Sequence, residues 1–303
     1  MARGNGPLPR EVLLVVHTGR AAARRSAAIV VDHFAAAGVL VRVLDSEAGA
    51  LNCSGVTVVP DDERAAAGVE VVLVLGGDGT LLRAAEIART AQAPVLGVNL
   101  GRVGFLAEAE RADLTSTVER VTRGSYDVEE RMTLDVAVRS PDFASAPAWA
   151  LNDCSVEKAA RQRVLDVVVE VDGRPLSRWS CDGVIAATPT GSTAYAFSAG
   201  GPVIWPEVEA LLVVPISAHA LFARPLVVSP TSVVALELAG EASGVLWCDG
   251  RRSLDLPAGT RVEIRRGAVP VRLARLHRGS FTDRLVSKFG LPVHGWRGSA
   301  QRA

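Results

Sequence analysis

Apolar residues follow two different patterns along the 303-residue chain, and the pattern changes near residue 126. In the first part, short apolar runs alternate with longer segments of helical spacing. This alternation predicts strands at 11–17, 39–45, 71–75 and 94–99, and helices at 20–37, 81–91 and 111–124. Strands that alternate with helices are typical of a parallel sheet covered by helices, so the first domain is predicted to be α/β. No element is assigned to 52–67.

After residue 126 the chain changes to short alternating or apolar runs that are separated by turns, which predicts an all-β half. The clearest predicted strands, with the turns that follow them, are 167–171 before Asp172-Gly173, 231–238, and 245–248 before Asp249-Gly250.

A single helix is predicted after these strands. Ser280 is placed to cap a helix at 281–289, and Gly290 is placed to end it. An isolated helix after many strands indicates a segment that returns to the first domain. The predicted division is therefore an α/β domain at 1–126, a β domain at 127–275 and a returning segment at 276–303.

Composition narrows the class of protein. With 49% hydrophobic residues the chain can bury a large core, and 33 basic against 33 acidic residues give no overall field for nucleic acid or an anionic membrane. No charge-free apolar run reaches the ~20 residues of a membrane helix. The cysteines have no C-x-x-C spacing, which argues against a zinc site or disulfide framework and favours a cytoplasmic location; they are Cys53, Cys154, Cys181 and Cys248.

A glycine-rich loop directly follows the predicted strand 71–75, and its residues are Gly76, Gly77, Asp78, Gly79 and Thr80. Glycines let the backbone approach an oxyanion, and successive N–H groups at a helix N-terminus favour phosphate. A carboxylate there repels phosphate unless a metal intervenes or it faces a hydroxyl that loses a proton. The loop therefore predicts phosphoryl transfer around Asp78, with an ordinary glycine turn as the alternative.

Two common phosphate loops do not match. The P-loop requires a lysine in G-x-x-x-x-G-K-[ST], but the lysines of this chain are Lys158 and Lys288, both outside glycine loops. The dinucleotide fingerprint G-x-G-x-x-G requires glycine where Leu82 stands. Both comparisons indicate a loop of another kind.

A second polar group of residues lies in the β half and consists of Asn152, Asp153, Asp182, Gly183 and the segment 188–202. Amides, carboxylates and hydroxyls beside glycines suit ribose, an adenine edge and pyrophosphate. The alternative is a set of β-turns. A serine hydrolase is disfavoured because Ser192 and Ser198 lack the glycines of G-x-S-x-G. The five histidines show no metal-ligand spacing, and His219 is left unassigned.

Taken together, these motifs resemble the NAD kinases, most closely the actinobacterial type. The resemblance rests on 76–80, 99–106, Asn152-Asp153, 182–202, 215–225 and 248–250. Phosphofructokinases and lipid kinases share the glycine loop, but lipid kinases usually continue it with an acidic-valine pair and an asparagine. This chain continues with Leu81, Leu82 and Arg83 instead, as NAD kinases do. It departs from the family pattern at Asp153, where NAD kinases usually have glutamate.

The resemblance implies a Rossmann-like α/β domain, a β-sandwich-like C-terminal domain and a homo-oligomer, either tetramer or dimer. It also implies transfer of a phosphoryl group from ATP, or from polyphosphate, to the 2′-hydroxyl of the adenosine ribose of NAD. Asp78 would accept the hydroxyl proton, and Mg or Mn would enter with the nucleotide, without a dedicated protein metal site. The NAD-binding residues would be Asp78, Gly79, Arg83, Asn152, Asp153, Arg163, Asp182, Thr193, Ala194, Tyr195, Ala196, Phe197 and Ser198. A non-catalytic dinucleotide sensor is the alternative, and the presence of Asp78 argues against it.

Overall fold

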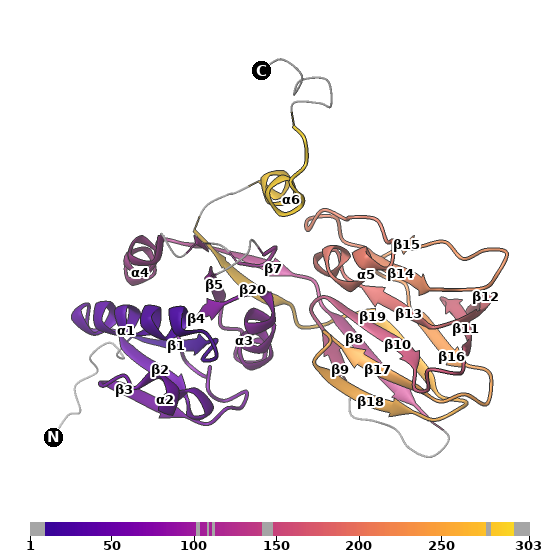
Figure 1. Cartoon of the computed structure of the whole chain (residues 1–303), viewed down its shortest axis with the longest axis horizontal. Helices are drawn as coiled ribbons and strands as arrows, with labels where there is room; N and C mark the ends of the chain where they lie inside the picture. Colours follow the sequence, from indigo (N-terminus) through magenta and orange to yellow (C-terminus); the bar gives the residue numbers. More distant parts are fainter. Residues whose placement is uncertain are drawn as a thin grey trace. The chain divides into compact units, whose positions relative to one another are not determined.

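The structure is a computed structural model, and it describes residues 10–100, 104–107, 109–110, 113–140, 148–276 and 280–293. The chain forms two compact units (Figure 1). The first combines Met1–Glu130 with Val271–Ala303, and the second is Arg131–Pro270. The chain therefore leaves the first unit once and returns to it.

A single sheet organises the first unit. Its order is β3-β2-β1-β4-β5-β20-β7, with β6 also on β5, and every pair from β3 to β20 is parallel. All six residues of β4 are buried, because a parallel sheet has helices on both faces. The strands are β1 (Glu11–Val16), β2 (Leu40–Leu44), β3 (Val56–Val59), β4 (Val71–Gly76), β5 (Val95–Asn99), β6 (Ala109–Glu110), β7 (Asp127–Arg131) and β20 (Val271–Arg275).

The helices of the first unit are α1 (Ala21–Ala36), α2 (Asp45–Leu51), α3 (Asp78–Ala91), α4 (Leu114–Thr122) and α6 (Phe281–Phe289). Ala23, Ala27, Val30 and Phe34 of α1 are buried at helical spacing against the sheet. The sequence did not predict α2, which follows β2 directly and ends at Asn52 in the left-handed region.

The C-terminal helix α6 has the predicted ends. The Ser280 hydroxyl accepts a hydrogen bond from the Thr282 N–H, and Gly290 has a φ of 60°. No residue of α6 is buried, but its Phe281 and Phe289 rings lie 6.0 and 5.8 Å from the ring of Phe105. The Arg284 guanidinium also donates to the Phe105 carbonyl at 3.1 Å. The helix therefore contacts the first unit at Phe105.

Two antiparallel sheets form the second unit, with orders β15-β14-β13-β10-β17-β18 and β12-β11-β16-β19-β8-β9. Alternate residues of both sheets share one core, which includes the fully buried Trp179. The strands are β8 (Leu134–Arg139), β9 (Ala148–Ala150), β10 (Asp153–Lys158), β11 (Leu165–Val171), β12 (Arg174–Cys181), β13 (Gly183–Ala187), β14 (Leu211–Ile216), β15 (Leu226–Val228), β16 (Val234–Leu238), β17 (Gly244–Cys248), β18 (Arg252–Leu256) and β19 (Arg261–Arg266).

A smaller cluster covers the other face of β13 and β14. Ile185 and Leu212 pack there with Ala196 of the short helix α5 (Tyr195–Ser198). A 3₁₀ turn, η2 (Thr190–Thr193), precedes α5. The parallel α/β sheet and the antiparallel sheets confirm the predicted fold class. Among the described helices, none combines the length and the apolar character needed to cross a membrane.

Candidate active site

The Asp78 loop, residues 76–80, lies where β4 ends and α3 begins. The strand order reverses between β1 and β4, and ligands of open α/β sheets bind beyond the carboxyl ends of strands at such a point. Gly77 precedes the first turn of α3, and its carbonyl accepts from the Thr80 and Leu81 N–H groups at 3.0 and 3.1 Å. The loop therefore presents a helix N-terminus, which attracts negative charge.

The carboxylate of Asp78 is held by main-chain groups of a second loop. Its oxygens accept from the Phe105 N–H at 3.2 Å and the Leu106 N–H at 3.4 Å. A Cβ atom at Gly104 would overlap this carboxylate, so glycine lets the carboxylate take this position and a larger residue would displace it. Residues 101–103 of the same motif lie outside the described residues. The glycine loop and the 99–106 motif thus meet at Asp78.

The three glycines of the Asp78 loop differ in what surrounds them. A Cβ atom at Gly76 would overlap the Thr80 side chain, which explains that glycine by internal packing. At Gly77 and Gly79 no atom of the described protein lies within 4 Å of such a Cβ. Neither has a positive φ. Glycine at these two positions leaves room for something outside the protein to approach the backbone.

Arg83, which the resemblance implies for NAD, binds groups that follow β2 and β3. Its guanidinium forms an ion pair with Glu47 at 2.7 Å and another with Asp61, and donates to the Ser46 hydroxyl at 2.9 Å. Glu47 is buried and also accepts from the Val16 N–H at 2.8 Å. Burial raises the pKa of Glu47 to about 7, although Val16 and Arg83 act in the opposite direction. Arg83 thus joins α3 to α2, and no local pattern in the sequence predicts this network.

The Asn152 bend, residues 151–153, carries the chain from β9 in one sheet of the second unit to β10 in the other. Its N–H groups point to Asp249, whose carboxylate accepts from Leu151 at 2.9 Å, Asn152 at 2.7 Å and Asp153 at 3.4 Å. The Thr188 N–H donates to the Asn152 carbonyl at 2.9 Å, from the opposite side. Both sides of the bend are therefore held by hydrogen bonds.

The carboxyl of Asp153 lies inside this arrangement. Asp153 is only 6% exposed, and the Tyr195 N–H donates to its carboxyl. Burial, followed by the charge of Asp249, raises the pKa of Asp153 to about 7. An ionised and a protonated carboxyl are thus both accessible near neutral pH. The structure brings Asp153 next to Tyr195 at the start of α5, as the prediction that both contact one ligand requires.

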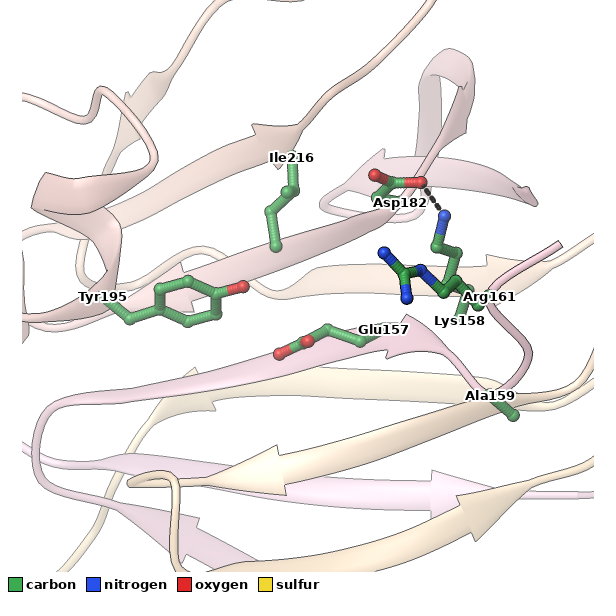
Figure 2. A pocket seen from close by; sticks show the side chains of 7 residues that line it. All are labelled: Glu157, Lys158, Ala159, Arg161, Asp182, Tyr195 and Ile216. Carbon is green, nitrogen blue, oxygen red and sulfur yellow. Dashed lines mark hydrogen bonds and ion pairs between the residues drawn. The ribbon is translucent and has the colours of Figure 1, made fainter. Parts of the chain in front are cut away.

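A pocket of about 400 Å³ is lined in part by Tyr195, the first residue of α5 (Figure 2). Asp182 forms an ion pair with Lys158 there, and the Tyr195 ring extends from α5 toward Glu157 and Ile216. The pocket is lined by Glu157, Lys158, Ala159, Arg161, Asp182, Tyr195 and Ile216. Of these residues only Asp182 and Tyr195 were predicted as site residues from the sequence, because nothing local to 157–161 resembles a motif.

The other predicted residues of the second unit have different surroundings. Ala196 is fully buried in the cluster under α5, whereas Phe197 is 38% exposed. The Thr193 hydroxyl donates to the Thr190 carbonyl at 3.2 Å. Arg163 is exposed and is not among the pocket residues. Ala194 and Ser198 lie at the two ends of α5, where Ala194 is half-buried and Ser198 is exposed.

In the part of the chain that the structure describes, no three His, Cys, Asp or Glu side chains are grouped so as to hold a metal ion.

Comparisons with known proteins agree with this arrangement. The ATP-NAD kinase N-terminal domain family matches residues 12–126, and the ATP-NAD kinase C-terminal domain family matches residues 151–276. The two families together define the chain as a phosphotransferase. The chain belongs to the NAD kinase family.

Individual relatives cover nearly the whole chain. An NAD kinase of Thermobifida fusca is 63% identical over 301 residues, with 96% of this chain and 92% of the relative covered. An NAD kinase 2 of Streptomyces coelicolor is 60% identical, with 96% and 97% covered.

Two solved structures share the fold. Yeast NADH kinase complexed with NADH has a TM-score of 0.87 at 23% identity, over 95% of this chain and 89% of that chain. An NAD kinase from Archaeoglobus fulgidus in complex with ATP has a TM-score of 0.67 at 26% identity, over 93% and 97%.

Proposed function

We propose that this chain transfers a phosphoryl group from ATP to the 2′-hydroxyl of the adenosine ribose of NAD, giving NADP, with Asp78 as the proton acceptor. The hydroxyl oxygen bonds to the γ-phosphorus as the bond from phosphorus to the β,γ-bridging oxygen breaks. ADP leaves, and the hydroxyl proton passes to the Asp78 carboxylate. The enzyme contributes mainly position and charge stabilisation, since phosphoryl transfer has a loose transition state.

The geometry of Asp78 carries this proposal. Two peptide N–H groups and the missing side chain of Gly104 fix the carboxylate at the start of α3. The open space at Gly77 and Gly79 supports approach of phosphate to the same turn. A fixed carboxylate next to a phosphate-binding turn is the arrangement that a general base for a hydroxyl needs.

The Asn152 bend and the pocket next to Tyr195 support the choice of a dinucleotide as acceptor. They offer amide, carboxylate and phenol groups, which match ribose hydroxyls and a carboxamide better than an acyl chain. The NADH complex of the yeast relative and the ATP complex of the archaeal relative agree with these two substrates. Arg83, Asp182, Arg163 and 193–198 remain predicted contacts.

A divalent cation, Mg or Mn, is expected to arrive with the ATP phosphates. Asp78 is the carboxylate of the Asp78 loop, and carboxylate oxygens are ligands that such a cation accepts. The cation would neutralise charge on the transferred phosphoryl group. Because the loop offers groups for phosphate, polyphosphate is a second donor to assay.

The test mixes purified chain with NAD, ATP and magnesium and measures NADP, with polyphosphate, diacylglycerol and sphingosine in parallel reactions. We expect NADP and no lipid phosphate. Lipid phosphorylation without NADP would overturn the proposal, and NAD binding without turnover would favour the dinucleotide sensor.

Sedimentation would test the predicted homo-oligomer. The cytoplasmic location also stays a prediction, supported by four free cysteines, of which Cys154, Cys181 and Cys248 are buried.

A further inference from the structure

Asp249 stands at the turn between β17 and β18 and reaches a segment almost a hundred residues earlier in the chain. Its side chain is 1% exposed, and its backbone has a φ of 54°. One carboxylate oxygen, Oδ2, accepts from the Leu151 N–H at 2.9 Å and the Arg252 guanidinium at 3.0 Å. The other, Oδ1, accepts from the Asn152 and Asp153 N–H groups at 2.7 and 3.4 Å. Four donors converge on one buried carboxylate.

The opposite side of the Asn152 bend is held as well. The Thr188 hydroxyl donates to the Leu151 carbonyl at 2.6 Å, and the Thr188 N–H donates to the Asn152 carbonyl at 2.9 Å. A Cβ atom at Gly191 would overlap the Asn152 carbonyl, so this segment packs directly on the bend. The Asn152 peptide therefore has no freedom to rotate unless Asp249 or Thr188 releases it.

A second Asp-Gly turn shows that the hydrogen bonds from Asp249 to the Asn152 bend do not follow from the turn type alone. Asp172, between β11 and β12, also has a φ of 53°, and its carboxylate accepts from the Val233 N–H at 2.9 Å and the Ser232 hydroxyl at 3.1 Å. That carboxylate holds the start of β16, where neither sequence nor structure indicates a site. The two aspartates share conformation, charge and role as acceptors, but only Asp249 holds residues of the proposed NAD site.

We propose that Asp249 is a positioning residue for NAD, which fixes the direction of the Asn152 side chain and the Asp153 carboxyl through their own peptide groups. This inference rests on the proposed function, because it takes Asn152 and Asp153 as NAD contacts. Asp249 would act through the bend and not by touching NAD, because its side chain is 1% exposed. Asp249 would hold the Asn152 bend in its binding conformation before NAD arrives. Binding then does not pay the entropic cost of ordering the bend.

An asparagine cannot take over this role. Both oxygens of Asp249 accept two donors each, but an asparagine side chain has one acceptor oxygen and an NH₂ group. In one orientation the NH₂ group would face the Leu151 N–H and the Arg252 guanidinium, and in the other it would face the Asn152 and Asp153 N–H groups. In both orientations one donor faces other donors. A buried donor without its acceptor is costly, so the bend would shift.

The experiment compares Asp249→Asn with Asp172→Asn in the full chain, using steady-state kinetics and thermal unfolding. For Asp249→Asn we expect KM for NAD to rise roughly 10- to 100-fold, while KM for ATP changes less than about threefold. For Asp172→Asn both KM values stay within about twofold, although each variant loses an acceptor of backbone hydrogen bonds. Calorimetric titration with NAD alone would show the same loss of affinity without turnover.

A purely structural role would give a different result. An equal rise in both KM values for Asp249→Asn, or a KM for NAD that matches that of Asp172→Asn, would overturn the inference while leaving the proposed function intact. If Asp249→Asn does not fold, Thr188→Val decides by the same criterion, since it removes the hydroxyl donor from the other side of the bend. A wild-type chain that neither binds NAD nor makes NADP would overturn the proposed function and this inference together.

Discussion

The Asp78 loop and the Asn152 bend use the same interaction in opposite directions. At Asp78, peptide N–H groups of residues 105 and 106 hold a carboxylate, and the carboxylate is the proposed proton acceptor. At Asn152, the carboxylate of Asp249 holds peptide N–H groups, and the side chains on those peptides are the proposed contacts. A carboxylate is thus the proposed reacting group in one region and the positioning group in the other. Changes to the two regions should therefore affect turnover and binding separately.

The largest effect is expected for Asp78→Asn. The change keeps the shape of the side chain but removes its basicity, so kcat should fall roughly 10²–10⁴-fold with the fold intact. Initial rates with saturating NAD and ATP measure this, and Asp32→Asn, on the exposed face of α1, is the matched control. Recovery at high magnesium would assign Asp78 to metal binding. A rate within about tenfold of the wild type would exclude it as the base.

Gly104→Ala tests whether the support of Asp78 matters as much as its chemistry. The new Cβ would overlap the Asp78 carboxylate and displace it, and we expect kcat to fall about 10²-fold. KM for NAD should change much less. Gly49→Ala in α2 is the control, because nothing in the described chain lies within 4 Å of its Cβ. Unchanged kcat in Gly104→Ala would show that the Asp78 position is not fixed by this contact.

Asn152→Ala tests the other region at its working side chain. Loss of the amide leaves polar groups of the substrate unpaired at a cost of about 1–3 kcal/mol, so KM for NAD should rise roughly tenfold. KM for ATP should rise less. Steady-state kinetics with each substrate varied in turn distinguish the two values. Equal effects on both substrates would reject the assignment of Asn152 to NAD.

The smallest effect is a change in how stability depends on pH. The pKa of Asp153 is raised to about 7 by burial and by Asp249, with Glu157 adding to it, so the folded protein binds a proton that the unfolded chain has released. Stability from this group is present at low pH and is lost as pH rises toward and through 7. Glu47 contributes with the same sign. Asp153→Asn should flatten the fall of Tm between about pH 4 and pH 7, and an unchanged slope would contradict the raised pKa.

Local signals in the sequence predicted the elements around Asp78 well. The apolar run before Gly76 and the Ser280 and Gly290 caps each act within a few residues, so they are visible in a single window. The short helix α2 was missed, because it contains Gly49 and has no apolar period of useful length.

Contacts between distant parts of the chain were not predictable in this way. Asp172-Gly173 and Asp249-Gly250 predict the same kind of turn from the local sequence. Only the pairing of β10 with β17 brings Asp249 to its partners 96 to 98 residues away in the chain. Likewise, no local pattern places β7 and β20 in the sheet of the first unit. Periodicity indicates that a strand forms, but tertiary packing decides which sheet it joins.

The return of β20 to the first sheet also sets an order of events during synthesis. All of Arg131–Pro270 is made before Val271–Arg275, so the second unit has its complete sequence while the first sheet still lacks a strand. The rings of α6 around Phe105 come later still. Phe105 carries an N–H group that holds Asp78. The surroundings of the proposed base are therefore among the last parts of the molecule to be completed as the chain leaves the ribosome.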